Sequence, residues 1–322
     1  MAFSNSRSLI ATMLAGILLY LFTFAFVVDK PLTTAEIGDY VTYKERYLAS
    51  IAPRRKIVIL AGSNGRYSHR CESVTEVTGI ACANLSTAAG LDLDWQMSRY
   101  LRYLGSGDVL YMPLEYWSKP VSATRVGAEA PFVVRHDHNA LSRYSARQLV
   151  GALFYFDVRY FFSALGEMML SRAGVQRRTS VRNLTVQGDE RGASAAKASA
   201  YRSFIQGLPA PTVSPTSYDD PTANAPVAKV LDDVRARGVI VVGGLPTTFD
   251  DTRIPTEVIA RLMTLFELHG GCFLVLPNLS LYPRRMFFDT EYHLQEDAQI
   301  AHSRIVAPYL ARIWQRRSCV TQ

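Results

Sequence analysis

The stretch KIVILAGSNGRYSHRCE, residues 56–72, decides the fold expected of this chain. Its apolar run at 57–61 is typical of a buried strand, and the small polar turn GSNG at 62–65 follows at once. A strand that leads into such a turn has two interpretations. It is an ordinary strand-to-helix connection, or it holds a nucleophile, here Ser63, at the carboxyl end of a sheet.

Apolar runs and amphipathic segments alternate in the same way along much of the chain. Further strands are expected at 80–86, 107–117, 239–246 and 272–277. Helices are expected at 91–105, 229–238 and 256–271, and a turn and a long helix close the chain over 287–315. Continuous apolar strands that alternate with helices predict an α/β domain with three α/β/α layers and about five parallel strands.

The amino terminus predicts a membrane anchor. LIATMLAGILLYLFTFAFVV, residues 9–28, carries no charge and has the length of about 20 residues that a membrane-spanning helix needs. A cleaved signal peptide usually has an apolar core of only about 7–15 residues and a small-x-small cleavage site, and this run ends in FVVDKP instead. Arg7 favours a cytosolic tail at 1–8, although Lys30 opposes this. We expect a single-pass protein of a bacterial inner membrane, with its main domain in the periplasm.

The rest of the chain is expected to form a connector and one large domain. Residues 29–55 form the connector, with a helix at 31–51. Residues 56–322 form the α/β domain, and an insertion occupies about 118–230. The aromatic helical segment 142–174 is a cap over the sheet edge, a membrane-facing surface or, as we favour, core.

Other segments of the insertion are polar. Residues 175–200 are polar and basic. Residues 207–227 contain five prolines and predict an extended surface loop. His69 and His302, outside the insertion, are expected on the surface or within helices.

Charge and cysteine content narrow the classes of partner. Lys and Arg outnumber Asp and Glu by 35 to 28, but the arginines are scattered and no nucleic-acid-binding motif is present, so we expect no nucleic-acid partner. The cysteines at 71, 82, 272 and 319 form no C-x-x-C pair. Cys71 and Cys82 are either a disulfide or buried free cysteines. The loop RHDH at 135–138 offers two histidines, too few for a metal site, so we expect no metal and no cofactor.

Catalytic side chains are expected where the strands end, because ligands bind at the carboxyl edge of an open parallel sheet. Ser63 follows the first strand. The segment FFDTEYHL at 287–294 places Asp289 and His293 together before the last helix. A serine becomes nucleophilic when a histidine takes its proton and a carboxylate orients that histidine. Alternatively, Asp289 is the N-cap of the last helix, and Glu291 is a second candidate for the carboxylate that orients His293.

Four short blocks carry a resemblance to a known family. They are Ala61-Gly62-Ser63-Asn64, Asn84-Leu85-Ser86 with Gly90, Gly107-Asp108-Val109 with Glu115-Tyr116, and Phe288-Asp289 with Tyr292-His293-Leu294. Their order and spacing resemble the SGNH, or GDSL-like, hydrolase and acyltransferase superfamily. More narrowly, they are similar to its membrane-anchored members associated with O-acylation of bacterial exopolysaccharides such as cellulose. The resemblance implies an SGNH or flavodoxin-like fold.

The resemblance also implies roles for individual residues. Ser63 is the expected nucleophile, His293 the base and Asp289 its orienting carboxylate. The expected oxyanion donors are Ser63, Ser86, Gly90 and Asn84, and the expected substrate contacts are Asn64, Arg66, Tyr67, Glu115 and Tyr116. The chain departs from the family pattern at Ala61 and Ser86, where glycines are usual, and at PLEYW, 113–117, where a Gly-x-Asn-Asp motif is usual.

Two functions follow as expectations. The first is a periplasm-facing serine esterase or O-acyltransferase that moves acyl groups, such as acetyl, on an exopolysaccharide through an acyl-enzyme on Ser63. The second is a catalytically reduced accessory protein of a polysaccharide synthesis or export complex. The expected partners are a polysaccharide, the membrane, and a membrane acyltransferase or polysaccharide synthase complex.

Overall fold

The computed structural model describes most of the chain, namely residues 2–28, 32–116, 126–155, 157–174, 181–219 and 221–319. Three of the expected features lie partly outside the described residues. They are the connector at 29–31, the start of the insertion at 118 and the last residue, 117, of an expected strand. The chain forms two compact units. The first unit consists of Met1–Gly38 and Ala123–Arg178, and the second unit consists of Asp39–Ser122 and Thr179–Gln322. Each unit is described by itself.

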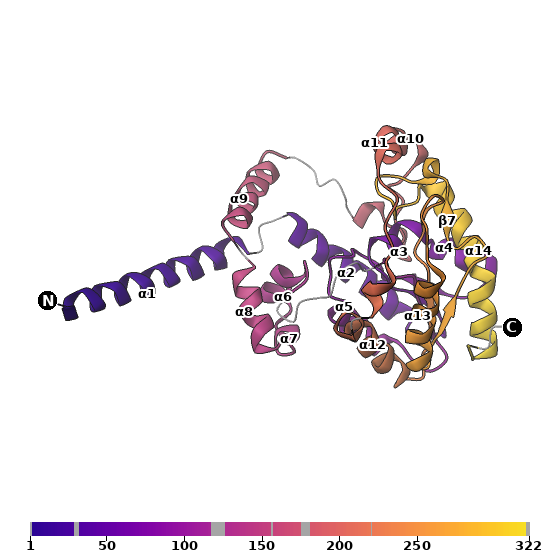
Figure 1. Ribbon diagram of the computed structural model, residues 1–322, viewed down its shortest axis with the longest axis horizontal. Coiled ribbons are helices and arrows are strands. Elements are labelled where there is room, and N and C mark those ends of the chain that lie inside the picture. The colour runs from indigo at the N-terminus through magenta and orange to yellow at the C-terminus, as the bar shows by residue number, and fades with distance from the viewer. Residues whose placement is uncertain are drawn as a thin grey trace. The chain divides into compact units, whose positions relative to one another are not determined.

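The second unit is built on a parallel sheet, as predicted. Within the described residues, five strands lie in the order β2-β1-β3-β4-β6, all parallel. Figure 1 shows the last helix of this unit in yellow, at the carboxyl end of the chain. The strands are β1 (Ile57–Ile59), β2 (Cys82–Asn84), β3 (Val109–Met112), β4 (Ile240–Gly244) and β6 (Cys272–Leu274). β1 and β3 are buried throughout, which explains their continuous apolar sequences.

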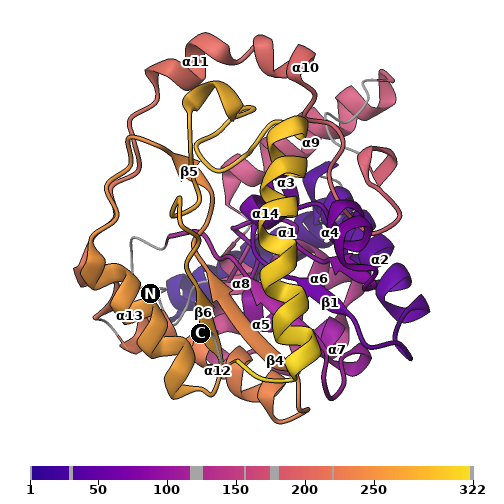
Figure 2. The same ribbon diagram turned by 90° about the vertical axis from the view of Figure 1, so that its right-hand side faces the viewer.

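One face of the sheet is covered by α4 (Cys71–Thr78) and α14 (Glu296–Arg316). Figure 2 shows α14 running across the front of this unit. Ile59 of the sheet, Val74 of α4 and Val306 of α14 belong to the same buried cluster. Burial of these aliphatic side chains is the main favourable contribution to folding of this layer.

The other face is covered by α12 (Pro221–Arg235) and α13 (Thr256–Leu268), which pack on β4. Gly243 of β4 permits the close approach of α13, because a Cβ atom there would lie 2.8 Å from ring atoms of Phe266. The sheet therefore has helices on both faces, and the predicted three-layer α/β/α fold is confirmed.

The expected loop at 207–227 is wrong in its last part. α12 begins at Pro221 rather than at residue 229, and it contains Pro226. Proline suits the first helical position, because the N–H it lacks would have no helical partner there.

Several short elements complete the second unit within the described residues. They are α3 (Ser63–Ser68), α5 (Leu93–Tyr100), α10 (Ala195–Ser199), α11 (Arg202–Gly207) and a small parallel pair of β5 (Thr248–Phe249) and β7 (Leu281–Tyr282). α2 (Leu32–Ser50) begins in the first unit and continues into the second.

The cysteines are paired. Cys71 of α4 bonds to Cys82 of β2, and Cys272 of β6 bonds to Cys319, which follows α14. Of the two alternatives for Cys71 and Cys82, a disulfide or free cysteines, the structure shows the disulfide.

The first unit is helical where it is described. It contains α1 (Ala2–Val27), α6 (Ala130–His136), α7 (His138–Leu141), α8 (Ala146–Phe154) and α9 (Val158–Arg172). Residues Arg7–Val27 are long and apolar enough to cross a membrane, as predicted.

The favoured assignment of 142–174 to a core is wrong. Val158 and Phe162 are 70% and 65% exposed, and Ala164 is the buried residue of α9. Tyr160 still packs against Phe24 and Val28 of the same unit, whereas Phe162 faces outward.

A buried ion pair fixes the amino ends of two strands. Lys56 Nζ lies 2.7 Å from Asp108 Oδ2, and the two side chains are 1% and 3% exposed. Asp108 also accepts the N–H of Lys56 at 3.0 Å and the N–H of Gly105 at 2.9 Å. A buried pair of this kind stabilises the fold only while both charges and their hydrogen bonds remain.

Asp108→Ala is expected to lower the free energy of unfolding by about 3–5 kcal/mol, because it leaves the Lys56 ammonium buried and unpaired. Urea denaturation followed by circular dichroism measures this. Glu76→Ala is the matched control: it removes the exposed pair with Arg304, and its expected cost is below about 1 kcal/mol. Equal losses in the two variants would contradict the role given to the buried pair.

Candidate active site

Ser63 is held by its neighbours on the backbone. It is the first residue of α3, directly after β1 and Gly62. Glu115, which follows β3, accepts the N–H of Gly62 at 3.0 Å and the N–H of Asn64 at 2.7 Å. The carboxylate thus fixes the peptides on both sides of Ser63. Glu115 was expected to contact substrate, and its contacts give it this holding role instead.

Burial raises the pKa of the Glu115 carboxyl above its usual value, because the charged form loses contact with water. The two N–H donors and, more weakly, the nearby His293 lower that pKa and so oppose the effect.

Asn64 ties this turn to two distant segments. Its Nδ2 atom donates to Thr247 Oγ1 at 2.8 Å and to the Tyr292 carbonyl at 3.0 Å. The residue has no exposed surface. The prediction that Asn64 contacts substrate is therefore wrong. Its amide holds the loop before His293 against the start of α3, and Ser68 assists by donating to the same carbonyl at 2.9 Å.

The predicted pair of Asp289 and His293 is formed. His293 Nδ1 lies 2.7 Å from Asp289 Oδ1, and the two side chains are 12% and 15% exposed. The imidazole also stacks on Tyr67, with ring centroids 4.1 Å apart and planes at 15°. Tyr67 was expected to contact substrate, and it supports the histidine instead.

Tyr67, which stacks on His293, belongs to the same short helix as Ser63. Residues four apart on a helix share a face, so Ser63 and Tyr67 lie on the same side of α3. His293 therefore packs over the face of α3 that carries Ser63. Among the described residues, neither the Ser63 hydroxyl nor His293 Nε2 makes a hydrogen bond, to each other or to a third group.

Asn84 and Ser86 do not supply an oxyanion donor. Asn84 Nδ2 donates to the carbonyls of Gly65 and His69, each at 3.0 Å, and Asn84 Oδ1 accepts the Ser86 N–H at 3.1 Å. The Ser86 hydroxyl accepts the N–H of Ala61 at 2.9 Å. Both predictions are wrong, because the Asn84 amide donates to carbonyls at α3 and the Ser86 N–H is bound to Asn84 Oδ1.

The backbone N–H that is placed to act as a second oxyanion donor belongs to Ala89, one residue before the predicted Gly90. Gly90 is exposed in a turn, whereas the backbone of Ala89 lies against Gly62. A Cβ atom on Gly62 would lie 2.6 Å from Ala89 N, so only glycine fits at that position. Within the described residues, the N–H groups of Ala89 and Ser63 make no hydrogen bond. The second sequence block indicated this segment, and Ala89 itself carried no signal.

Arg66 is also placed away from any substrate. Its Nη2 atom donates to Tyr40 Oη at 2.6 Å, its Nε donates to Glu190 Oε2 at 2.9 Å, and it is 6% exposed. The predicted contact of Arg66 with a sugar or acyl donor is wrong.

Tyr116 is half-buried, and its hydroxyl makes no hydrogen bond to a described residue. Burial raises the pKa of that hydroxyl.

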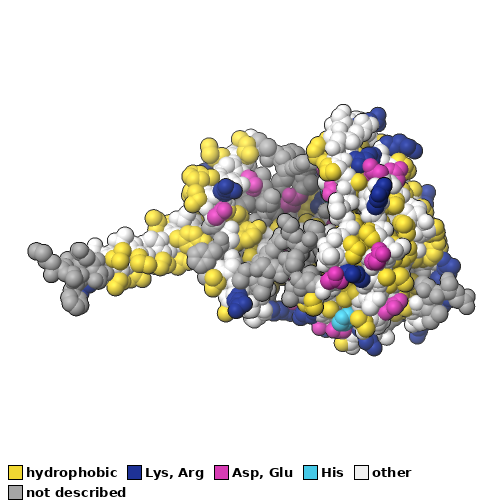
Figure 3. All heavy atoms as spheres, in the orientation of Figure 1, with side chains coloured by type: hydrophobic (Ala, Val, Ile, Leu, Met, Phe, Trp, Pro, Cys, Tyr) yellow, Lys and Arg dark blue, Asp and Glu magenta, His cyan; other side chains and the backbone are white. Residues whose placement is uncertain are grey.

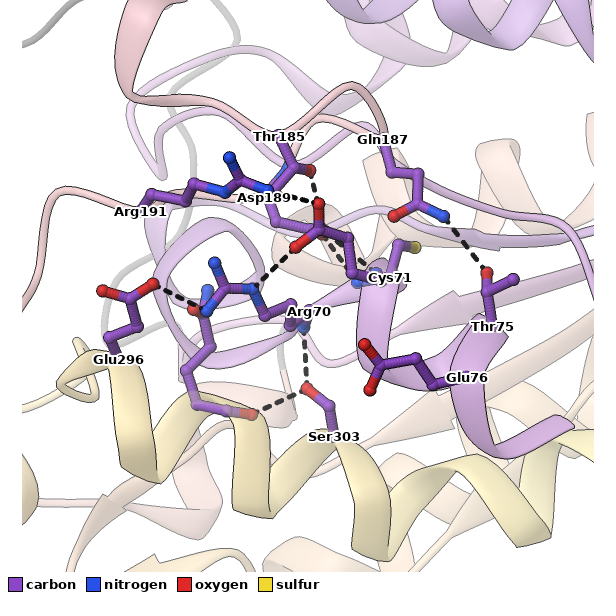
Figure 4. A network of polar contacts seen from close by, with 12 residues as sticks. Arg70, Cys71, Thr75, Glu76, Thr185, Gln187, Asp189, Arg191, Glu296 and Ser303 are labelled. Atoms are coloured by element: carbon purple, nitrogen blue, oxygen red, sulfur yellow. Dashed lines mark hydrogen bonds and ion pairs between the residues drawn. The ribbon is translucent and has the colours of Figure 1, made fainter.

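A further network holds the joint between α3 and α4 (Figure 4). Asp189 accepts the N–H of Cys71 at 2.7 Å and that of Glu72 at 3.1 Å, and so caps α4. Arg70 Nη1 donates to Glu296 Oε1 at 2.8 Å and binds this joint to α14. Asp189 carried no sequence signal, because the helix start that it caps lies more than a hundred residues away along the chain.

His69 and His302 are buried rather than on the surface; His302 lies in α14, which was one of the two expected alternatives. His69 and His302 have no exposed surface, and their Nε2 atoms lie 3.1 Å apart. His302 Nδ1 lies 2.7 Å from Tyr282 Oη. Burial lowers the pKa of His302 to about 3 and holds the pKa of His69 well below its usual value.

These histidines predict a loss of stability in acid. The unfolded chain takes up protons on histidine below about pH 6.5, whereas the folded protein resists protonation of His302 down to about pH 3. The free energy of unfolding is expected to fall by up to about 1.4 kcal/mol per pH unit for each histidine as the pH falls below about 6.5. Urea denaturation at several pH values measures the slope.

His302→Gln serves as the control, because glutamine keeps hydrogen-bonding capacity but does not titrate. Its slope is expected to be smaller than that of the unaltered protein by up to one proton. An unchanged slope would exclude His302 as a source of the pH dependence.

The site therefore contains a half-buried serine, a histidine–carboxylate pair and two backbone donors with no partner among the described residues. No cluster of three or more His, Cys, Asp or Glu side chains is placed to hold a metal ion within the described parts of the chain. No protein-family model, curated protein or solved structure matches this sequence.

Proposed function

We propose that this protein is a serine esterase or O-acyltransferase that acts through Ser63. One observation carries the proposal. The Asp289–His293 pair packs, through Tyr67, on the face of α3 that begins with Ser63. A carboxylate on Nδ1 leaves Nε2 as the basic atom, which is the arrangement that a serine nucleophile requires.

The chemistry follows from these roles. Ser63 Oγ attacks the carbonyl carbon of an acyl ester, and its proton moves to His293 Nε2. The bond between the acyl carbon and the leaving oxygen breaks, and His293 returns the proton to that oxygen. Water or a second hydroxyl then attacks the acyl-enzyme and restores Ser63. The hydrogen bond between Ser63 and His293 closes when substrate is bound, as often happens in such sites.

The N–H groups of Ser63 and Ala89 are the proposed oxyanion donors, because neither has a partner among the described residues. Glu115 keeps the geometry of the Ser63 N–H by holding the N–H groups of Gly62 and Asn64. Prepositioned donors of this kind stabilise the negative charge of the tetrahedral intermediate.

The substrate and the location are part of the proposal. The resemblance of the sequence blocks favours acetyl or other acyl groups of an exopolysaccharide. The apolar helix α1 anchors the protein in a bacterial inner membrane, with the main domain in the periplasm. Two disulfides support an oxidising compartment.

Ser63→Ala is expected to abolish labelling by a fluorophosphonate probe and to lower kcat on an aryl acetate by at least about 1,000-fold. His293→Gln removes the base, and kcat is expected to fall by about 100- to 10,000-fold. Mass spectrometry of the labelled peptide identifies the modified serine. Ser98→Ala, a half-buried serine of α5, is the control and keeps full labelling. Full activity in the Ser63→Ala protein would exclude the mechanism.

Glu115→Gln tests the holding role. An amide NH₂ then faces one of the two backbone N–H donors, so the expected loss is about 1–3 kcal/mol of unfolding free energy. The rate of probe labelling is expected to fall with it, because Ser63 loses its fixed position. Glu257→Gln, an exposed glutamate of α13, is expected to change neither quantity. A Glu115→Gln protein with unchanged stability would contradict this role.

A catalytically reduced accessory protein of a polysaccharide synthesis or export complex is the second candidate. The observation that favours it is the Glu115 carboxylate beside Ser63, since a negative charge there opposes an oxyanion. Absence of probe labelling on folded protein, with retained binding to a polysaccharide, would select this alternative.

A further inference from the structure

The first turn of α9 lies beside the apolar part of α1. Tyr160 Oη donates to the Val28 carbonyl at 3.1 Å, and Tyr160 packs with Phe24 and Val28. Because Arg7–Val27 is the segment that is able to cross a membrane, α9 begins at the depth of one end of that span.

An apolar cavity of about 290 Å³ lies between the two helices. Gly16, Tyr20 and Phe24 line it from α1, and Val158 and Phe161 line it from α9. Gly16 lies near the middle of the span, so the cavity reaches well into it. Most of the lining is apolar, although Thr23 and Asp157 also belong to it. Lipid hydrocarbon therefore suits most of this space, because water there would have few polar partners.

The surface around the junction of α8 and α9 is exposed and apolar. Val150 and Tyr155 of this junction are 54% and 36% exposed, and Val158 and Phe162 of α9 are 70% and 65% exposed. Figure 3 shows hydrophobic side chains along α1 and over α9. A cluster of exposed apolar side chains marks an interaction site more often than it marks ordinary surface.

The polar residues of the junction suit a headgroup region. Arg147 of α8 and Arg159 of α9 are exposed. Tyr155 and Tyr160 add two aromatic rings with polar tips. Tyrosine and arginine are typical of segments that lie in the interface between headgroups and hydrocarbon.

We infer that Val150, Tyr155 and the first turns of α9 form a membrane-contact surface that lies in the bilayer interface beside α1. This inference rests on the proposed anchoring by α1 and not on the proposed catalysis. The occupant is lipid, because the surface continues the apolar face of a helix that spans the hydrocarbon. The protein would then be held in the membrane by α1, which spans the bilayer, and by the start of α9, which lies in the interface.

The test uses fluorescent reporters in the full chain. A cysteine at Phe162 or Val158 receives an environment-sensitive dye, and the four native cysteines are paired in disulfides. The protein is reconstituted in vesicles of phosphatidylethanolamine and phosphatidylglycerol that carry spin-labelled lipids. Leu268→Cys is the matched control, since Leu268 is an exposed apolar residue of the other unit, and Leu18→Cys reports on α1 itself.

Reporters at Phe162 and Val158 are expected to lose more than half of their fluorescence to spin labels near the headgroups, while the Leu268 reporter is unaffected. The Leu18 reporter is expected to respond to labels deep in the bilayer. Quenching at Leu18 without quenching at the α9 positions would overturn the contact surface and leave the anchor intact. A blue-shifted α9 reporter that lipid labels do not quench would assign the surface to a protein partner instead. An unquenched Leu18 reporter would remove the anchor, and the inference with it.

Discussion

The hydrogen bond from Asn64 Nδ2 to the Tyr292 carbonyl, at 3.0 Å, is the contact on which the candidate site depends. It joins the residue after Ser63 to the residue before His293, across more than two hundred positions of the chain. Together with the Ser68 hydrogen bond to the same carbonyl and the stacking of Tyr67 on His293, it fixes the turn after β1 relative to the loop before α14. The same amide reaches Thr247 beyond β4, so three strand-end segments share one buried side chain.

Much of the fold follows from local sequence. The apolar runs that form β1, β3 and β4 are buried on both faces of a parallel sheet, and such runs are recognisable without knowledge of partners. The pairing of Asp289 with His293 was also predictable, because the two residues lie four apart in one short segment.

The errors concern residues whose roles are set by distant partners. Arg66 follows the nucleophile turn closely, and only the position of Glu190 shows that it points into the interior. Asn84 and Ser86 matched a family block, but their hydrogen bonds go to α3 and to β1. Exposure of α9 was not predictable either, since a lipid-facing helix and a core helix have the same composition. Periodicity reports that a face is apolar and does not report what covers it.

Three buried or half-buried carboxylates of the second unit have a common arrangement. Asp108, Asp189 and Glu115 each accept two or more backbone N–H groups, and each lies at the end of a strand or at the start of a helix. Carboxylates held in this way replace the water that the peptide groups lose on folding. Their cost in solvation is therefore offset locally, and the backbone around the site is made rigid.

The two disulfides lie at the two outer strands of the sheet, β2 and β6. An outer strand presents unpaired peptide groups that can recruit another chain, and such edges are where sheet proteins begin to aggregate. Each edge here is covalently tied to a helix or to the tail beyond a helix, which restricts its separation from the sheet. The disulfides therefore disfavour pairing of these outer strands with strands of another molecule. This effect is lost when the cysteines are reduced.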